Sequence, residues 1–225
     1  LNLISSFEKD FTKHKKYTGW NDIAFNKNLI KLRKKKDVFS AIYNTALKSN
    51  SLQIIPFENK LHKIAGKFLN IDDSKLTIRG ITFRMDPPND KKNSYGWHQD
   101  SIYDKFNVDS KNGVILWIPL IDANKKNGTL DVKIGSENSS YHCSSLVKKS
   151  TKYNSKQILV DKKHLKKYRT KHIPVKKNNG LVTFNGLFHR SGVNLSNKFR
   201  FTLVVRYGNM FADDFIFRRN LRKKI

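Results

Sequence analysis

The segment formed by residues 198–207 restricts the possible folds most strongly, because its side chains alternate between two kinds. In an extended chain, one face of this segment would be wholly apolar and the other mainly polar. The apolar set is Phe199, Phe201, Leu203 and Val205, and the opposite set is Arg200, Thr202, Val204 and Arg206. The alternation predicts a β-strand that packs one face against a hydrophobic core.

Further strands are predicted before this segment, at residues 76–85, 113–121, 129–134 and 181–184, with turn sequences between them. Residues 1–70 instead carry apolar side chains at spacings of three and four, which predicts helices over 25–49 and 57–68. The order of these elements predicts a mainly β fold with flanking helices. We expect a jelly-roll, cupin-like double sheet braced by the N-terminal helices.

The length of 225 residues fits one domain, which we predict to span residues 1–225. Within it we expect helical support from 1–70 and the jelly-roll core from 75–207. Residues 137–172 form a long polar, lysine-rich insertion in this core, and loops of that length often cover a pocket. Residues 208–225 are predicted to form an exposed basic tail.

The formal net charge of +27 would attract nucleic acid, anionic membranes or acidic metabolites. Most of this charge comes from lysines spread along the whole chain, which is typical of a solvated surface, and no nucleic-acid-binding motif is recognisable. The single cysteine, Cys143, excludes an internal disulfide and a cysteine-based zinc site. No apolar run reaches the roughly 20 residues of a membrane span, so a cytoplasmic protein is the default expectation. The chain begins at Leu1, which leaves an N-terminal signal open.

The first candidate for chemistry is the pair His98 and Asp100, which follow Trp97. In a strand their side chains point to the same face. One histidine, one aspartate and a second histidine form the facial triad of non-haem Fe(II) oxygenases. His189 is the candidate for the second histidine. The alternatives are a polar pair in a turn for His98 and Asp100, and an ordinary core or surface residue for His189.

Arg200 follows His189 by eleven residues, and a turn between them would allow the two segments to pair and to line one cavity. Arginine suits a carboxylate ligand because its planar fork donates two parallel hydrogen bonds. Ser191 and Thr202 would add hydroxyl groups, and Trp117 would add a flat wall. The alternatives are a structural ion pair for Arg200 and a core position for Trp117.

Candidate substrate contacts are Arg84 and Arg206, because an arginine inside a barrel is costly unless it meets an anion. Gln99, between the two candidate ligands, is a further candidate. These residues favour a small anionic substrate. Nucleic acid is not favoured as a partner, and the sequence leaves the oligomeric state open.

Four short sequence blocks follow one another within residues 75–207. They are Trp97-His98-Gln99-Asp100, Leu116-Trp117-Ile118-Pro119-Leu120, Asn127-Gly128-Thr129-Leu130 with Gly135-Ser136, and His189-Arg190-Ser191-Gly192-Val193-Asn194 followed by Arg200. Together, and in this order, the blocks resemble the phytanoyl-CoA dioxygenase family. The sequence departs from the usual family pattern at Ile134 and Glu137 and at Gly180-Leu181. Both departures fall in loops that we expect near the pocket and not at the candidate ligands.

The resemblance implies a double-stranded β-helix that uses Fe(II), 2-oxoglutarate and O2, with iron held by His98, Asp100 and His189. It implies that Arg200, helped by Ser191, binds the distal carboxylate of 2-oxoglutarate, with Trp117 at the same pocket. An intact Asp100 favours hydroxylation over halogenation. The expected substrate is a small metabolite such as a sugar, a phosphorylated compound or an acyl-CoA. The alternatives are a basic nucleic-acid-binding protein on a related barrel and a cupin-like metal protein of other activity.

Overall fold

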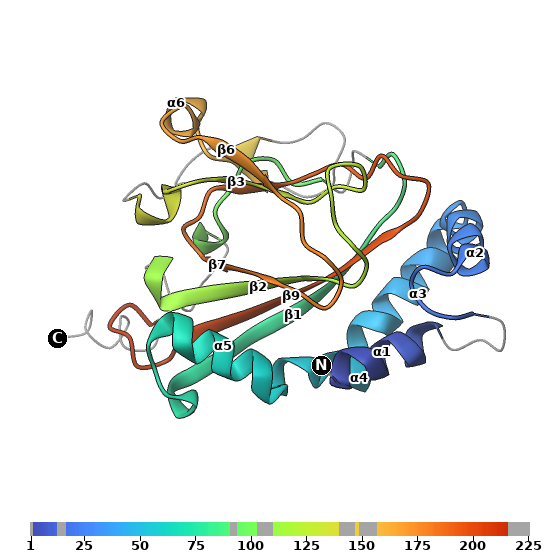
Figure 1. Cartoon of the computed structure of the whole chain (residues 1–225), viewed down its shortest axis with the longest axis horizontal. Coiled ribbons are helices and arrows are strands. Elements are labelled where there is room, and N and C mark those ends of the chain that lie inside the picture. Colours follow the sequence, from blue (N-terminus) through green and yellow to red (C-terminus); the bar gives the residue numbers. More distant parts are fainter. Residues whose placement is uncertain are drawn as a thin grey trace.

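The computed structural model describes residues 2–12, 17–90, 94–102, 110–139, 147–148 and 157–215. Two antiparallel sheets face each other, and helices cover the outer side of one of them (Figure 1). The larger sheet has the order β1-β9-β2-β7, with β1 (Leu76–Asp86), β9 (Arg200–Asn209), β2 (Gly113–Pro119) and β7 (Leu181–Phe184). The smaller sheet has the order β6-β3-β8, with β6 (Thr170–Ile173), β3 (Leu130–Lys133) and β8 (His189–Ser191).

The helices in residues 2–69 pack against the larger sheet. They are α1 (Asn2–Thr12), α2 (Ile23–Arg33), α3 (Lys36–Lys48), α4 (Asn50–Gln53) and α5 (Asn59–Leu69). Short 3-10 turns are η1 (Ile55–Phe57), η2 (Asp73–Lys75), η4 (Asp100–Ile102), η5 (Ser110–Asn112) and η6 (Ser136–Asn138). The main hydrophobic core lies between these helices and the sheet, so the helices support the sheet from behind.

Strand β9 has the two faces that its sequence predicts. Phe201, Leu203 and Val205 are fully buried in the core under the helices, where the Phe201 ring lies 4.6 Å from that of Trp20. Val204 points to the other side and packs with Trp117 between the two sheets. Each buried apolar side chain of this size contributes roughly 1.5–3 kcal/mol. The core therefore fixes which face of β9 is turned toward the space between the sheets.

The predicted fold class is confirmed: the described residues form antiparallel sheets with flanking helices in a jelly-roll arrangement. The segment that contains His98 extends the smaller sheet, because His98 forms an isolated bridge with His189. The backbone N–H of His98 donates to the carbonyl of His189 at 2.9 Å, and the reverse bond is 3.0 Å. This bridge brings two sequence blocks about ninety residues apart together.

Two local predictions are wrong. β8 and β9 do not pair, because β8 pairs with β3 in the smaller sheet while β9 pairs with β1 and β2 in the larger one. The apolar face of β9 must meet the helices, which places β9 in the other layer. In addition, Asp100 is not in a strand with His98 but begins the 3-10 turn η4. A turn, rather than strand alternation, brings these two side chains together.

The described part of the predicted insertion contains β4 (Val147–Lys148), β5 (Gln157–Ile158) and α6 (Lys162–Leu165). Val160 packs against Phe188, with Trp97 beside them. The backbone N–H of Val160 donates to the carbonyl of Trp97 at 2.8 Å. This part of the insertion therefore supports the segment that holds His98. Residues 140–146 and 149–156, with Cys143 among them, and the end of the basic tail at 216–225 lie outside the described residues.

Where the structure is described, it contains no helix with the length and apolar character needed to span a bilayer.

Candidate metal centre

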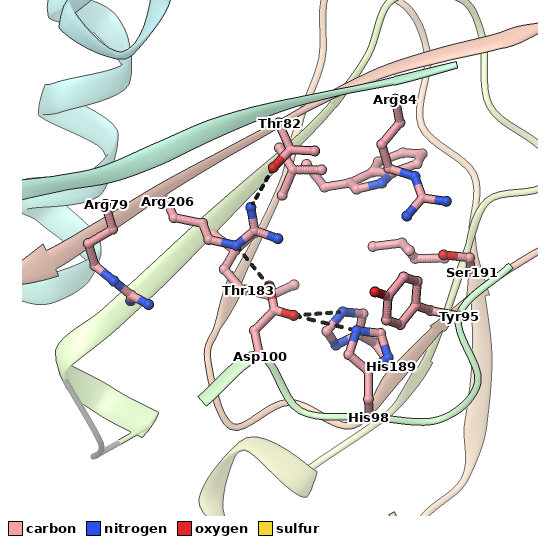
Figure 2. A pocket seen from close by; sticks show the side chains of 14 residues that line it. Arg79, Thr82, Arg84, Tyr95, His98, Asp100, Thr183, His189, Ser191 and Arg206 are labelled. Carbon is pink, nitrogen blue, oxygen red and sulfur yellow. Dashed lines mark hydrogen bonds and ion pairs between the residues drawn. The ribbon is translucent and has the colours of Figure 1, made fainter. Parts of the chain in front are cut away.

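A cavity of about 380 Å³ lies between the two sheets, within the size range of small-molecule sites, roughly 300–1,000 Å³. Its polar lining comes from both layers (Figure 2). The lining residues are Arg79, Thr82, Arg84, Tyr95, His98, Asp100, Ile115, Trp117, Leu130, Thr183, His189, Ser191, Val204 and Arg206. The cavity thus contains the three candidate metal ligands.

His98, Asp100 and His189 converge on one point of this cavity. The Oδ1 atom of Asp100 lies 3.4 Å from Nε2 of His98 and 4.0 Å from Nε2 of His189. One potential ligand atom from each residue lies within 4.8 Å of the others. Among the described residues, this is the group of histidine, cysteine and carboxylate side chains able to hold a metal ion.

The two imidazoles are oriented by backbone carbonyl groups. Nδ1 of His98 lies 2.8 Å from the carbonyl oxygen of Gly96, and Nδ1 of His189 lies 3.0 Å from that of Leu187. Because a carbonyl oxygen can only accept, each Nδ1 carries a hydrogen, and Nε2 is the ring nitrogen that lies near Asp100. Burial, together with the neighbouring His98, lowers the pKa of His189 to about 4. The His189 ring therefore presents a neutral nitrogen to the cavity.

Asp100 supplies the charge of the group. Burial alone would raise the pKa of its carboxyl, but the close contact with the His98 imidazole and the positive charge of Arg206 hold that pKa far below its ordinary value. Oδ2 accepts from Nε of Arg206 at 3.3 Å, so Oδ1 is the oxygen turned toward the two histidines. Two imidazole nitrogens and one carboxylate oxygen form a donor set that suits Fe(II).

Arg200 does not line the cavity. Its guanidinium group is 3% exposed and forms an ion pair with Asp86, with Nη2 2.7 Å from Oδ2. Nη1 donates to the carbonyl of Gly128 and, at 3.3 Å, to that of Gly192. A Cβ atom at Gly128 would lie 2.5 Å from Nη1, so the close approach requires glycine. The surroundings of Arg200 are those of a structural ion pair.

Asp86 is shared between two arginines, because Arg84 also donates to it, with Nη2 2.8 Å from Oδ1. Burial alone would raise the pKa of Asp86, but the charges of Arg84 and Arg200 lower it to about 2. The three groups together carry one excess positive charge. Since Arg84 lines the cavity and Arg200 does not, Arg84 presents that charge to the cavity.

The other predicted residues divide between the cavity and its surroundings. Ser191, Trp117, Arg84 and Arg206 line the cavity. Thr202 is fully buried behind it, and its hydroxyl has no hydrogen-bond partner among the described residues. Gln99 points away from the cavity and donates to the carbonyl of Gly186 at 2.9 Å, so it is not a candidate substrate contact in this structure.

Four polar residues of the cavity were not predicted as site residues: Arg79, Thr82, Tyr95 and Thr183. A signal for Arg79 exists in the sequence, because Gly80 interrupts an otherwise regular strand, and such a glycine often marks a β-bulge. Tyr95 directly precedes the first sequence block. Thr82 and Thr183 carry no sequence signal that separates them from ordinary strand residues.

Comparisons with known proteins agree with this geometry. The family model for phytanoyl-CoA dioxygenase (PhyH) matches residues 5–202, which is most of the chain. No curated protein matches the sequence.

Several solved structures share the fold. The epimerase SnoN in complex with Fe3+, alpha ketoglutarate and nogalamycin RO aligns over 72% of this chain and 60% of that chain, with 12% identity and a TM-score of 0.58. EvdO2 from Micromonospora carbonacea var. aurantiaca aligns over 79% and 64%, with 18% identity and a TM-score of 0.54. The nickel complex of the non-heme monooxygenase ThoJ aligns over 83% and 69%, with 17% identity and a TM-score of 0.53. The chain thus spans about three fifths of the length of SnoN.

Proposed function

The chain belongs to the phytanoyl-CoA dioxygenase family, and on this premise we propose that it is an Fe(II)- and 2-oxoglutarate-dependent dioxygenase that hydroxylates a small anionic metabolite. The observation that carries the proposal is the convergence of His98, Asp100 and His189 inside a cavity of suitable size. The family match and this group favour an enzyme over a nucleic-acid-binding protein, because the three side chains are buried between the sheets rather than lying on an exposed basic surface.

The three side chains fit an iron ion without rearrangement of their hydrogen bonds. His98 and His189 would each contribute Nε2 while Nδ1 stays bonded to a carbonyl, and Asp100 would contribute Oδ1 while Arg206 holds Oδ2. Iron bound there with 2-oxoglutarate would supply the activation of O2 that is coupled to oxidative decarboxylation to succinate and CO2. The protein's contribution is to leave coordination positions open and to exclude bulk water.

We assign the distal carboxylate of 2-oxoglutarate to Arg84 rather than Arg200. Arg84 lines the cavity with Tyr95 and Ser191, whose hydroxyl groups lie on the same side of the metal group (Figure 2). Arg200 has its donors occupied by Asp86 and by backbone carbonyls. In this assignment Arg200 positions Asp86, and Asp86 in turn holds the Arg84 guanidinium.

The proposed activity is tested by decarboxylation of carboxyl-labelled 2-oxoglutarate by the purified full chain under air. We expect release of labelled CO2, with succinate, that requires added Fe(II) and is slow until a substrate is supplied. Zinc binding without oxo-acid binding would instead support a cupin-like metal protein of another activity. Tight, salt-sensitive binding of DNA or RNA without decarboxylation would support the nucleic-acid alternative.

The Arg84→Gln variant is expected to raise the KM for 2-oxoglutarate by about 100-fold, because loss of a desolvated charge partner costs several kcal/mol. The fold should be retained, since Asp86 keeps its ion pair with Arg200. The measurement is decarboxylation over a range of oxo-acid concentrations, with thermal unfolding to confirm folding.

Arg84→Lys is the matched control for this variant. It keeps the charge and loses the planar fork, so an intermediate KM is expected. A folded Arg84→Gln protein with an unchanged KM would show that Arg84 does not bind the cosubstrate.

A further inference from the structure

We propose that the end of the cavity lined by Arg79, Arg206, Thr82 and Thr183 is a subsite for a doubly charged anionic group of the substrate, a phosphate monoester. This inference rests on the proposed function, because it assigns the opposite end, with Arg84, to 2-oxoglutarate. Figure 2 shows Arg79, Arg206 and Thr183 on one side of the metal group, and Arg84, Tyr95 and Ser191 on the other.

A β-bulge places Arg79 in the cavity. Strand β1 pairs with β9 so that Ile78 is opposite Tyr207 and Gly80 is opposite Arg206, which leaves Arg79 as the extra residue. Ile78 and Tyr207 pack in the core under the helices. Counted back from Arg84, which lines the cavity, regular alternation would turn Arg79 toward the core. The bulge shifts the alternation, so Arg79 also lines the cavity, on the face opposite to Ile78. Bulges of this kind commonly redirect a side chain at an active site.

Gly80 makes this bulge possible. Its φ angle is +125°, which glycine adopts readily and other residues rarely do. A Cβ atom at Gly80 would meet no atom within 4 Å, so the requirement for glycine here comes from the backbone conformation and not from crowding. Glycine is an unfavourable residue inside a strand, but here it permits the bulge that places Arg79 in the cavity.

Arg206 is held beside the metal group with an edge toward the cavity. Its Nε donates to Oδ2 of Asp100 at 3.3 Å, and its Nη1 donates to Oγ1 of Thr82 at 3.1 Å. The side chain remains 29% exposed, on the cavity side that it lines. An arginine fixed by two bonds and open at one edge is prepared for an oxyanion, because little side-chain entropy remains to be lost on binding.

The charge balance of the cavity favours a dianion. Three arginines and one carboxylate, Asp100, line it, while Arg200 and Asp86 offset each other behind it. A ferrous ion and the 2-oxoglutarate dianion have equal and opposite charges, so the loaded cavity would retain two positive charges. Buried positive charge is costly unless an anion compensates it. A phosphate monoester supplies two negative charges and acceptor oxygens for the hydroxyl groups of Thr82 and Thr183.

The test is calorimetric titration of inorganic phosphate into the nickel-loaded full chain, with saturating 2-oxoglutarate and constant ionic strength. Nickel prevents turnover, so binding is measured without activity. We expect millimolar binding that Arg79→Gln weakens about 10-fold, consistent with loss of one charged hydrogen-bond donor. Thr183→Val is a second, milder variant, with an expected loss of about threefold, and it keeps the proposal testable if Arg79→Gln does not fold.

Arg169→Gln is the matched control, because it removes one positive charge from an exposed position outside the cavity. It should leave phosphate binding within about twofold of the unmodified protein, as a screened surface charge contributes little. An equal loss in Arg169→Gln and Arg79→Gln would reveal non-specific attraction and overturn the subsite.

Two further outcomes separate this inference from the proposed function. Normal binding of 2-oxoglutarate without phosphate binding would remove the subsite and leave the oxygenase proposal intact. Failure to bind 2-oxoglutarate would instead remove the proposed function itself. If Arg79→Gln weakened binding of 2-oxoglutarate and not of phosphate, the two ends of the cavity would have the reverse assignment.

Discussion

The Asp100→Ala variant is expected to lose iron binding and oxo-acid turnover, with decarboxylation reduced by at least about 1,000-fold, because changes behind a metal ligand alone typically cost roughly 10–100-fold. The variant removes the negative ligand and leaves the two imidazoles next to the positive Arg206. Such a site attracts a divalent cation poorly. Metal content after dialysis and labelled CO2 release measure the two effects independently.

Asp131→Asn is the matched control for this change. Asp131 is also a buried carboxylate with an arginine partner, Arg190, at 2.8 Å, but it does not line the cavity. Its substitution should lower thermal stability and leave iron binding in place. Iron-dependent decarboxylation at the unmodified rate in Asp100→Ala would contradict the assignment of Asp100 as a ligand.

The metal group could be predicted from the sequence because its members lie in short local patterns. His98 and Asp100 are two residues apart, and His189 begins a block of its own. What the sequence did not reveal is how they meet. The bridge between His98 and His189 and the turn at Asp100 are products of the tertiary fold, and the same residues in a simple strand would have had a different geometry.

The position of Arg200 could not be predicted from the sequence alone. Its position eleven residues after His189 predicted a common cavity, but its acid partner, Asp86, lies 114 residues earlier. No local pattern reports a pair at that separation, because it depends on β1 and β9 lying side by side. The alternation of β9 was nevertheless predicted correctly, since that pattern depends only on which face meets the core.

The placement of Arg79 and Arg84 in one cavity could not be predicted from the sequence either, although the two residues are close in the chain. Both lie on β1, five residues apart, and regular alternation would put them on opposite faces. Only the bulge before Gly80 allows both to line one cavity. A single glycine in a strand suggests a bulge, but the side chain that it redirects follows from the pairing with β9.

Replacing Arg200 is expected to affect stability more than cosubstrate binding. In Arg200→Met, Asp86 loses the closer of its two cations and the carbonyls of Gly128 and Gly192 lose a donor. Removal of one partner from a buried ion pair costs about 3–5 kcal/mol. For a chain of this length that corresponds to a fall in Tm of roughly 10 °C. Thermal unfolding at neutral pH measures this loss.

The pH dependence of unfolding tests whether the ion pair between Asp86 and Arg200 stabilises the fold. The folded pKa of Asp86, about 2, lies below the ordinary value of 3.8, so its ion pairs stabilise the fold above about pH 4. This contribution is lost as the pH falls from 4 toward 2. Without Arg200 the folded pKa should rise toward the ordinary value. The stability difference between Arg200→Met and the unmodified protein should therefore shrink in acid.

The double variant Asp86→Asn with Arg200→Met separates the ion pair from packing. It removes both members of the pair, so comparing its stability with that of the two single variants gives the energy of the interaction between them. The resemblance to the enzyme family implies a different role, in which Arg200 binds the oxo-acid directly. In that case Arg200→Lys would raise the KM for 2-oxoglutarate with little change in Tm. Arg84→Gln would then leave the KM for 2-oxoglutarate unchanged. The pairing of Arg200 with Asp86, and the position of Arg84 in the lining of the cavity, favour the reverse result.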